Sequence, residues 1–176
     1  MAKAQTDDLA ELTGFAEPEN PFELFDGRQS PTAAAVQRGT CRLLAQMGYA
    51  AVTELPLATG RRIDVMGLGQ KGELLAIEIK SSLADFRADQ KWPGYLSFCD
   101  RFFFAVPADF PREVLPAEVG LIVADRYGAE VLRDAPTDKL VGARRKAVTL
   151  LFARVAARRL YGAIEGLGPP PAEDAP

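Results

Sequence analysis

The chain has 176 residues, of which 48% are hydrophobic and 26% are charged, and its formal net charge is −3. This composition is typical of a soluble globular domain, and no stretch approaches the roughly 18 apolar residues of a membrane span. The N-terminus also lacks the apolar segment of a signal peptide, so we expect a cytoplasmic protein with no membrane partner.

The sequence has no histidine and two cysteines, Cys41 and Cys99. A Ser-His-Asp triad, a Cys-His pair and a histidine zinc site are therefore excluded, as is a disulfide framework. Both cysteines lie among apolar residues and are predicted to pack in the core. Hydrolytic chemistry in this chain must use carboxylates, lysine and a metal ion that accepts oxygen ligands.

The first 28 residues contain seven acidic and two basic side chains and show no sustained periodicity. Residues 1–28 are therefore predicted to form an acidic N-terminal arm. Residues 29–165 are predicted to form a single domain, and residues 166–176, rich in Gly, Pro and acid, a disordered tail.

A helix is predicted after the arm, because Ser30 and Pro31 are a typical N-cap and first helical residue and Gly48 is a typical residue just past a helix end. Met47 is expected to face the core and Gln37 the solvent. The segment between Ser30 and Tyr49 contains no carboxylate, so we expect no metal ligand from this helix.

Residues 50–57 predict the first strand, which Pro56 ends or places at a sheet edge. Val52 is expected to face the core and Leu55 the opposite side. Glu54 has two open interpretations. It is either an auxiliary group that approaches a metal ion from the neighbouring strand, or a solvated carboxylate at the edge.

Residues 62–66 and 75–80 alternate in a period of two, and the glycines between them supply turn residues, so a strand hairpin is predicted. A turn centred on Lys71 would place Asp64 opposite Glu78, with Cβ atoms roughly 5 Å apart. Lys80 shares the face of Glu78, since residues i and i+2 of a strand point the same way.

Two carboxylates at that separation repel each other unless a cation lies between them. Mg²⁺ fits, because it takes oxygen ligands and is commonly bound by one or two carboxylates with waters and substrate phosphates. Asp64, Glu78 and Lys80 are therefore the candidate catalytic residues, with Mg²⁺ or Mn²⁺ as the expected cofactor. Arg61 and Arg62 directly precede the first carboxylate and would either clamp a phosphate or form an exposed pair.

A helix is predicted after Ser82, which with Asp85 resembles a capping box in which Asp replaces Glu. Arg87, Gln90 and Lys91 would lie on one face of it. Gln90 is a possible auxiliary to the metal site, and Arg87 and Lys91 are candidates for phosphate contacts. A plain amphipathic helix explains the same residues equally well.

Further along the chain, residues 101–106 form an apolar run that predicts a strand covered on both faces, as in a parallel or mixed sheet. Residues 120–124 and 131–132 predict two more strands, and residues 138–165 a helix. Seven basic and no acidic side chains lie within residues 139–159, which is either a phosphate-binding patch or a solvated helix face. They are Lys139, Arg144, Arg145, Lys146, Arg154, Arg158 and Arg159.

The spacing of Asp64, Glu78 and Lys80 resembles the PD-(D/E)xK nuclease superfamily, although Ile63 stands where that name has proline. The surrounding run resembles the MmcB-like DNA repair family within it, over roughly residues 28 to 125. The resemblance implies an α/β, restriction-endonuclease-like fold, with an α-β-β-β-α-β core, a mixed central sheet flanked by helices, and here an extra strand and a C-terminal helix. The matching segments are Glu-Leu-Pro-Leu-Ala-Thr-Gly-Arg-Arg-Ile-Asp and Ile-Glu-Ile-Lys-Ser-Ser-Leu-Ala-Asp-Phe-Arg-Ala-Asp-Gln-Lys-Trp-Pro-Gly-Tyr.

Our leading hypothesis is a metal-dependent deoxyribonuclease in DNA repair. Asp64, Glu78 and the Ile79 backbone carbonyl would bind the metal, which lowers the pKa of the attacking water. Lys80 would position that water or neutralise charge that develops on the phosphate. The alternatives are a catalytically silent DNA-binding accessory module on the same fold, and a structural domain in which Glu78 and Lys80 form an ordinary ion pair. DNA is the expected partner, with a homodimer or other repair proteins also open.

Overall fold

A computed structural model describes residues 29–57, 59–88 and 91–166. The predicted acidic arm, the predicted tail after residue 166 and Gln90 lie outside these residues. The helices and strands follow in the order α2 (Pro31–Gln46), β1 (Ala50–Pro56), β2 (Arg62–Leu68), β3 (Leu74–Ile79), α3 (Leu83–Ala88), 3-10 helix η1 (Trp92–Phe98), β4 (Arg101–Val106), 3-10 helix η2 (Arg112–Val114), β5 (Gly120–Ala124), β6 (Ala129–Arg133) and α4 (Gly142–Ile164).

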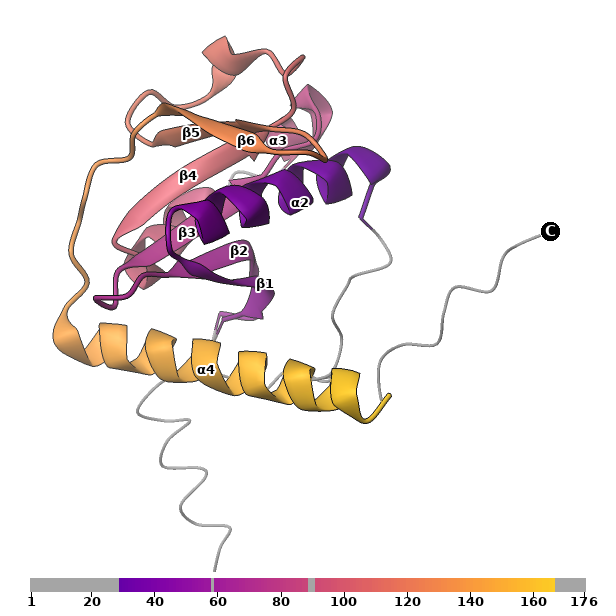
Figure 1. Ribbon diagram of the computed structural model, residues 1–176. Helices are drawn as coiled ribbons and strands as arrows, with labels where there is room; N and C mark the ends of the chain where they lie inside the picture. The colour runs from indigo at the N-terminus through magenta and orange to yellow at the C-terminus, as the bar shows by residue number, and fades with distance from the viewer. Residues whose placement is uncertain (1–28, 58, 89–90, 167–176) are drawn as a thin grey trace, which may run out of the picture.

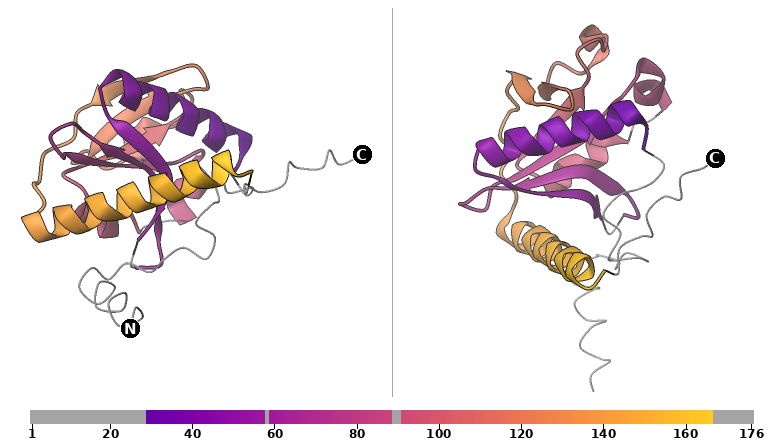
Figure 2. Two further views of the ribbon diagram at one scale, coloured as in Figure 1. Left: turned by 60° about the horizontal axis from the view of Figure 1, so that its bottom comes forward. Right: turned by 45° about the vertical axis from the view of Figure 1, so that its right-hand side comes forward.

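The strands form one six-stranded mixed sheet in the order β1-β2-β3-β4-β5-β6 (Figure 1). The first three strands are antiparallel neighbours, β3, β4 and β5 run parallel, and β6 returns antiparallel to β5. Helices α2 and α4 lie on opposite sides of this sheet, as Figure 2 also shows. The expected α/β class, with helices flanking a mixed sheet and a helix at the C-terminal end, is confirmed.

Two hydrophobic clusters fill the two faces of the sheet. One contains residues of α4 such as Val148 and Phe152 together with Phe102 and Phe104 of β4. The other contains Val36 and Leu44 of α2 packed on Val65, Ile77 and Phe103. Strand β4 is buried on both faces, as the unbroken apolar run of residues 101–106 predicts for a strand inside a sheet.

Helix α2 begins as predicted, with the Ser30 hydroxyl accepting a hydrogen bond from the Ala33 N–H at 3.1 Å. Two of its side chains differ from expectation: Gln37 is buried, with 6% of its surface exposed, and Met47 is 44% exposed. Helix α2 packs so closely on the β5–β6 turn that a Cβ on Gly39 would clash with the backbone oxygen of Asp125. Local periodicity does not reveal that contact.

Asp100 joins three parts of the chain. Its buried carboxylate accepts two hydrogen bonds of 2.6 Å from Arg145 of α4, and one each from the N–H groups of Leu74 and Leu140. Burial alone would raise the pKa of Asp100, but the bonds from Arg145 and the two backbone groups outweigh it and hold the pKa below its ordinary value. Arg145 therefore serves the fold.

The two cysteines are free thiols, and Cys99 is buried. Burial raises the pKa of Cys99 to about 12 and also raises that of Cys41. The predicted core position is confirmed for Cys99, whereas Cys41 is partly buried against the edge of a core cluster. Within the described residues, no helix combines the length and apolar character that a membrane span requires.

Candidate functional site

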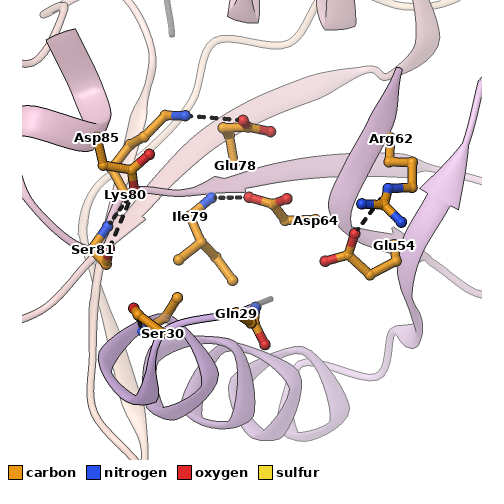
Figure 3. A pocket seen from close by; sticks show the side chains of 11 residues that line it. Gln29, Ser30, Glu54, Arg62, Asp64, Glu78, Ile79, Lys80, Ser81 and Asp85 are labelled. Carbon is orange, nitrogen blue, oxygen red and sulfur yellow. Dashed lines mark hydrogen bonds and ion pairs between the residues drawn. The ribbon is translucent and has the colours of Figure 1, made fainter. Parts of the chain in front are cut away.

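A polar pocket of about 410 Å³ lies where β2 begins and β3 ends, beside the start of α2. Gln29 and Ser30 line it from just before α2, and Asp85 lines it from α3 (Figure 3). None of these three is a predicted site residue. The remaining polar lining comes from the first three strands and the two residues after β3, and it includes every carboxylate that sequence reasoning assigned to the site. These predicted residues are Glu54, Arg62, Asp64, Glu78, Ile79 and Lys80.

The predicted hairpin register is the observed one. Val65 pairs with Ile77, and the same register places Asp64 opposite Glu78 at the next step. Asp64 Oδ2 accepts a hydrogen bond of 2.7 Å from the Ile79 N–H, so the carboxylate of β2 is held against the backbone of β3 (Figure 3). A carboxylate has about four lone-pair sites, so this bond leaves Asp64 with further acceptor capacity.

Glu78 and Lys80 form a buried ion pair along one face of β3. The distance from Lys80 Nζ to Glu78 Oε1 is 3.1 Å, and the two side chains are 3% and 6% exposed, respectively. The contact arises because the residues are two apart on one strand, and the Lys80 N–H continues the pairing with β4 by donating to Ala105. The prediction that Lys80 and Glu78 share one face is confirmed, and their direct ion pair is the contact that the structural-domain alternative expects.

Strand β1 twists sharply at Glu54, which has a φ of +48°. This left-handed conformation reverses the alternation, so that Leu55 packs in the same cluster as Val52. The prediction that Leu55 faces the opposite side is therefore wrong. The β1–β2 register places Glu54 opposite Asp64, and Glu54 Oε2 lies 3.4 Å from Arg62 Nε.

The residues predicted to contact phosphates differ in their contacts and in their exposure. Arg62 pairs with Glu54 at the pocket, whereas Arg61 donates a 3.0 Å hydrogen bond to the Lys91 carbonyl and packs over Gly94. Arg87 is exposed on α3. Lys91 is exposed but precedes η1 rather than lying on α3, so the single helical face expected for Arg87 and Lys91 is not formed.

The basic segment 139–159 is only partly a surface patch. Arg145 is committed to Asp100, and Arg159 donates hydrogen bonds to the carbonyls of Thr53 and Glu54. Arg144 lies over the Phe98 ring at 5.2 Å. The interpretation of this whole segment as phosphate-binding is therefore wrong for at least Arg145 and Arg159, whose partners lie far away in the sequence.

A divalent ion is compatible with the donors in the pocket. Across the described residues, no group of three or more His, Cys, Asp or Glu side chains lies close enough to enclose a metal. Asp64 and Glu78 supply two carboxylates on adjacent strands. That set suits Mg²⁺, which keeps several waters and is commonly bound by one or two carboxylates with substrate phosphates.

Comparison with known proteins gives a family. The model of a family described as "DNA repair protein MmcB-like" matches residues 20–166. The chain belongs to the MmcB-like family. A solved structure, the SPO1766 protein of unknown function from Silicibacter pomeroyi, is 49% identical, with a TM-score of 0.76 over 82% of this chain and 99% of that one. No functionally curated protein is similar enough to compare. Membership of an MmcB-like family indicates a role in DNA repair.

Proposed function

We propose that this MmcB-like protein is a divalent-metal-dependent deoxyribonuclease of the PD-(D/E)xK superfamily. The observation that carries the proposal is the meeting of Asp64, Glu78 and Lys80 in one pocket, with Glu78 and Lys80 in contact at 3.1 Å. The element order supports a restriction-endonuclease-like fold, since a helix, three antiparallel strands, a helix and a parallel strand follow in turn.

Each residue has a distinct task in this proposal. Asp64 and Glu78, with the Ile79 carbonyl, would hold Mg²⁺ or Mn²⁺, which supplies Lewis-acid polarisation of the phosphate and a lowered pKa for the attacking water. The Ile79 N–H keeps the Asp64 carboxylate in place at 2.7 Å before substrate arrives. Lys80 would donate a hydrogen bond to the attacking water or to a phosphate oxygen, where its charge offsets the charge that develops there.

Three basic side chains support a nucleic-acid partner. Arg62 is half-exposed at the pocket and Arg87 and Lys91 are exposed on the segment that follows β3. Arginine and lysine side chains at such positions bind phosphates through charge-assisted hydrogen bonds. We assign these three residues to backbone contacts, which set orientation rather than base preference.

A cleavage assay on a panel of labelled oligonucleotides tests this function. Duplex, single-stranded, nicked, flap and junction substrates are incubated with Mg²⁺ or Mn²⁺, with the Glu78→Gln protein in parallel. We expect metal-dependent cleavage of at least one substrate and loss of cleavage in the variant. Salt-sensitive binding to one substrate without cleavage would contradict the nuclease assignment and favour a catalytically silent accessory module.

A further inference from the structure

Glu54 is the one residue other than glycine with positive φ among the described residues, and it lies within a strand. The left-handed conformation is unfavourable for a residue with a Cβ. Such conformations persist where surrounding contacts fix them, and they are concentrated at functional sites. The twist places the Glu54 side chain in the pocket lining, in the register position beside Asp64.

Contacts on both sides hold this conformation. From α4, Arg159 donates hydrogen bonds to the carbonyl oxygens of Thr53 and Glu54, the latter at 3.1 Å. From β2, the Arg62 guanidinium lies 3.4 Å from the Glu54 carboxylate (Figure 3). The Arg62 side chain is 48% exposed and that of Glu54 is 15% exposed, so the guanidinium is reachable from solvent while its carboxylate partner is mostly covered.

This inference rests on the proposed function. We propose that the Glu54 carboxylate occupies the place on the Arg62 guanidinium that a DNA phosphate takes when DNA binds. Exchange of the carboxylate for the phosphate then couples DNA binding to metal binding. A guanidinium presents the same fork of donors to a carboxylate and to a phosphate. A phosphodiester entering the pocket can therefore take over the Arg62 contact without rearranging the strand that carries it.

The exchange changes the charge of the pocket. While Arg62 is paired with Glu54, its positive charge offsets one of the three carboxylates that β1, β2 and β3 contribute. Once a phosphate takes Arg62, the Glu54 carboxylate adds its charge to those of Asp64 and Glu78. The pocket then attracts a divalent cation more strongly, and by linkage a bound cation increases affinity for DNA by the same factor.

The test compares DNA affinity in wild type and Glu54→Gln. A fluorescent phosphorothioate duplex, which resists cleavage, is titrated by anisotropy in EDTA and then at increasing Ca²⁺. Since the Arg62 member of the pair is half-exposed, and an ion pair that water reaches is worth up to about 1 kcal/mol, Glu54→Gln should bind the duplex roughly two- to fivefold more tightly in EDTA. Ca²⁺ should raise the affinity of wild type by a larger factor than that of the variant.

Three further variants make the result specific. Glu130→Gln removes an equal charge from β6, at the opposite edge of the sheet, and should leave affinity nearly unchanged. In an Arg62→Gln background, Glu54→Gln should no longer tighten binding. Glu54→Gly also removes the carboxylate, and because glycine accepts a φ of +48° at little cost it should fold at least as stably as wild type.

Equal or weaker DNA binding by both Glu54 variants in EDTA would overturn the exchange, whatever the cleavage assay shows. Tighter binding without cleavage of any substrate would keep the exchange and refute the nuclease function. The two proposals can therefore fail separately.

Discussion

Replacing Lys80 with methionine should show how much the ion pair in the pocket contributes to the free energy of unfolding. Methionine keeps an unbranched apolar stem and removes the ammonium that lies 3.1 Å from Glu78 Oε1. Because the two side chains are only 3% and 6% exposed, the variant leaves a buried carboxylate without its ammonium partner. Breaking one partner of such a pair costs about 3–5 kcal/mol.

We expect the lower end of that range, about 3 kcal/mol, since both side chains line a pocket that water can enter. With a urea dependence of about 1–3 kcal/mol per molar, the unfolding midpoint of Lys80→Met in EDTA should fall by roughly 1–3 M. The measurement is equilibrium urea unfolding followed by fluorescence of the single tryptophan, Trp92, which stacks on Phe102 in the core.

The double variant Lys80→Met/Glu78→Gln serves as the control. It removes both charges, so it should be more stable than Lys80→Met alone, and the two substitutions should not be additive. Adding Mg²⁺ should stabilise Lys80→Met more than it stabilises wild type, because a cation then replaces the lost ammonium. A cost below about 1 kcal/mol, or strict additivity in the double variant, would refute the reasoning.

Two further predictions concern the fold that carries the pocket. The pKa of Asp100 is held below its ordinary value by Arg145 and backbone N–H groups, so its stabilisation is complete above about pH 4 and is lost as the pH falls through the folded-state pKa. Asp100→Asn should therefore cost about 3 kcal/mol at pH 7 in urea unfolding and progressively less below pH ~4, whereas a constant cost would contradict the assignment. Gly39→Ala should lower the melting temperature, because the added Cβ would clash with the Asp125 backbone at a cost of about 1–3 kcal/mol. The control Gly142→Ala should leave the melting temperature unchanged, because a Cβ there meets open space. Equal changes in the two variants would refute this packing.

Local signals in the sequence were sufficient for much of the fold and for the centre of the site. Helix α2 begins after the N-cap Ser30 and ends before Gly48, as the conformational preferences of these two residues predict. The hairpin register follows from the position of the turn, so Asp64 and Glu78 could be placed opposite each other from spacing alone. The alternation predicted for residues 63–66 is wrong, because Ile63 packs in the same cluster as Met66 and Val65 packs in the other. Periodicity of two also explains why Lys80 reaches Glu78.

What sequence reasoning missed depends on contacts between distant segments. The sequence near Glu54 does not predict a left-handed conformation in the middle of a strand. The groups that stabilise this conformation include Arg159, which is 105 residues away. For the same reason, the sequence around Arg145 does not show that this side chain pairs with Asp100. The close approach of α2 to the β5–β6 turn at Gly39 is another such contact, and helical periodicity does not predict it.

Single-turnover cleavage of the preferred DNA substrate in Mg²⁺ tests the central claim most directly, with wild type, Asp64→Asn and Asp85→Asn compared. Both carboxylates line the pocket, but that of Asp85 is engaged just before α3, where it accepts hydrogen bonds from the Ser81 N–H at 3.0 Å and the Ser81 hydroxyl at 3.3 Å. We predict that Asp64→Asn abolishes cleavage while Asp85→Asn cleaves at nearly the wild-type rate. Cleavage by Asp64→Asn at the wild-type rate would contradict the account.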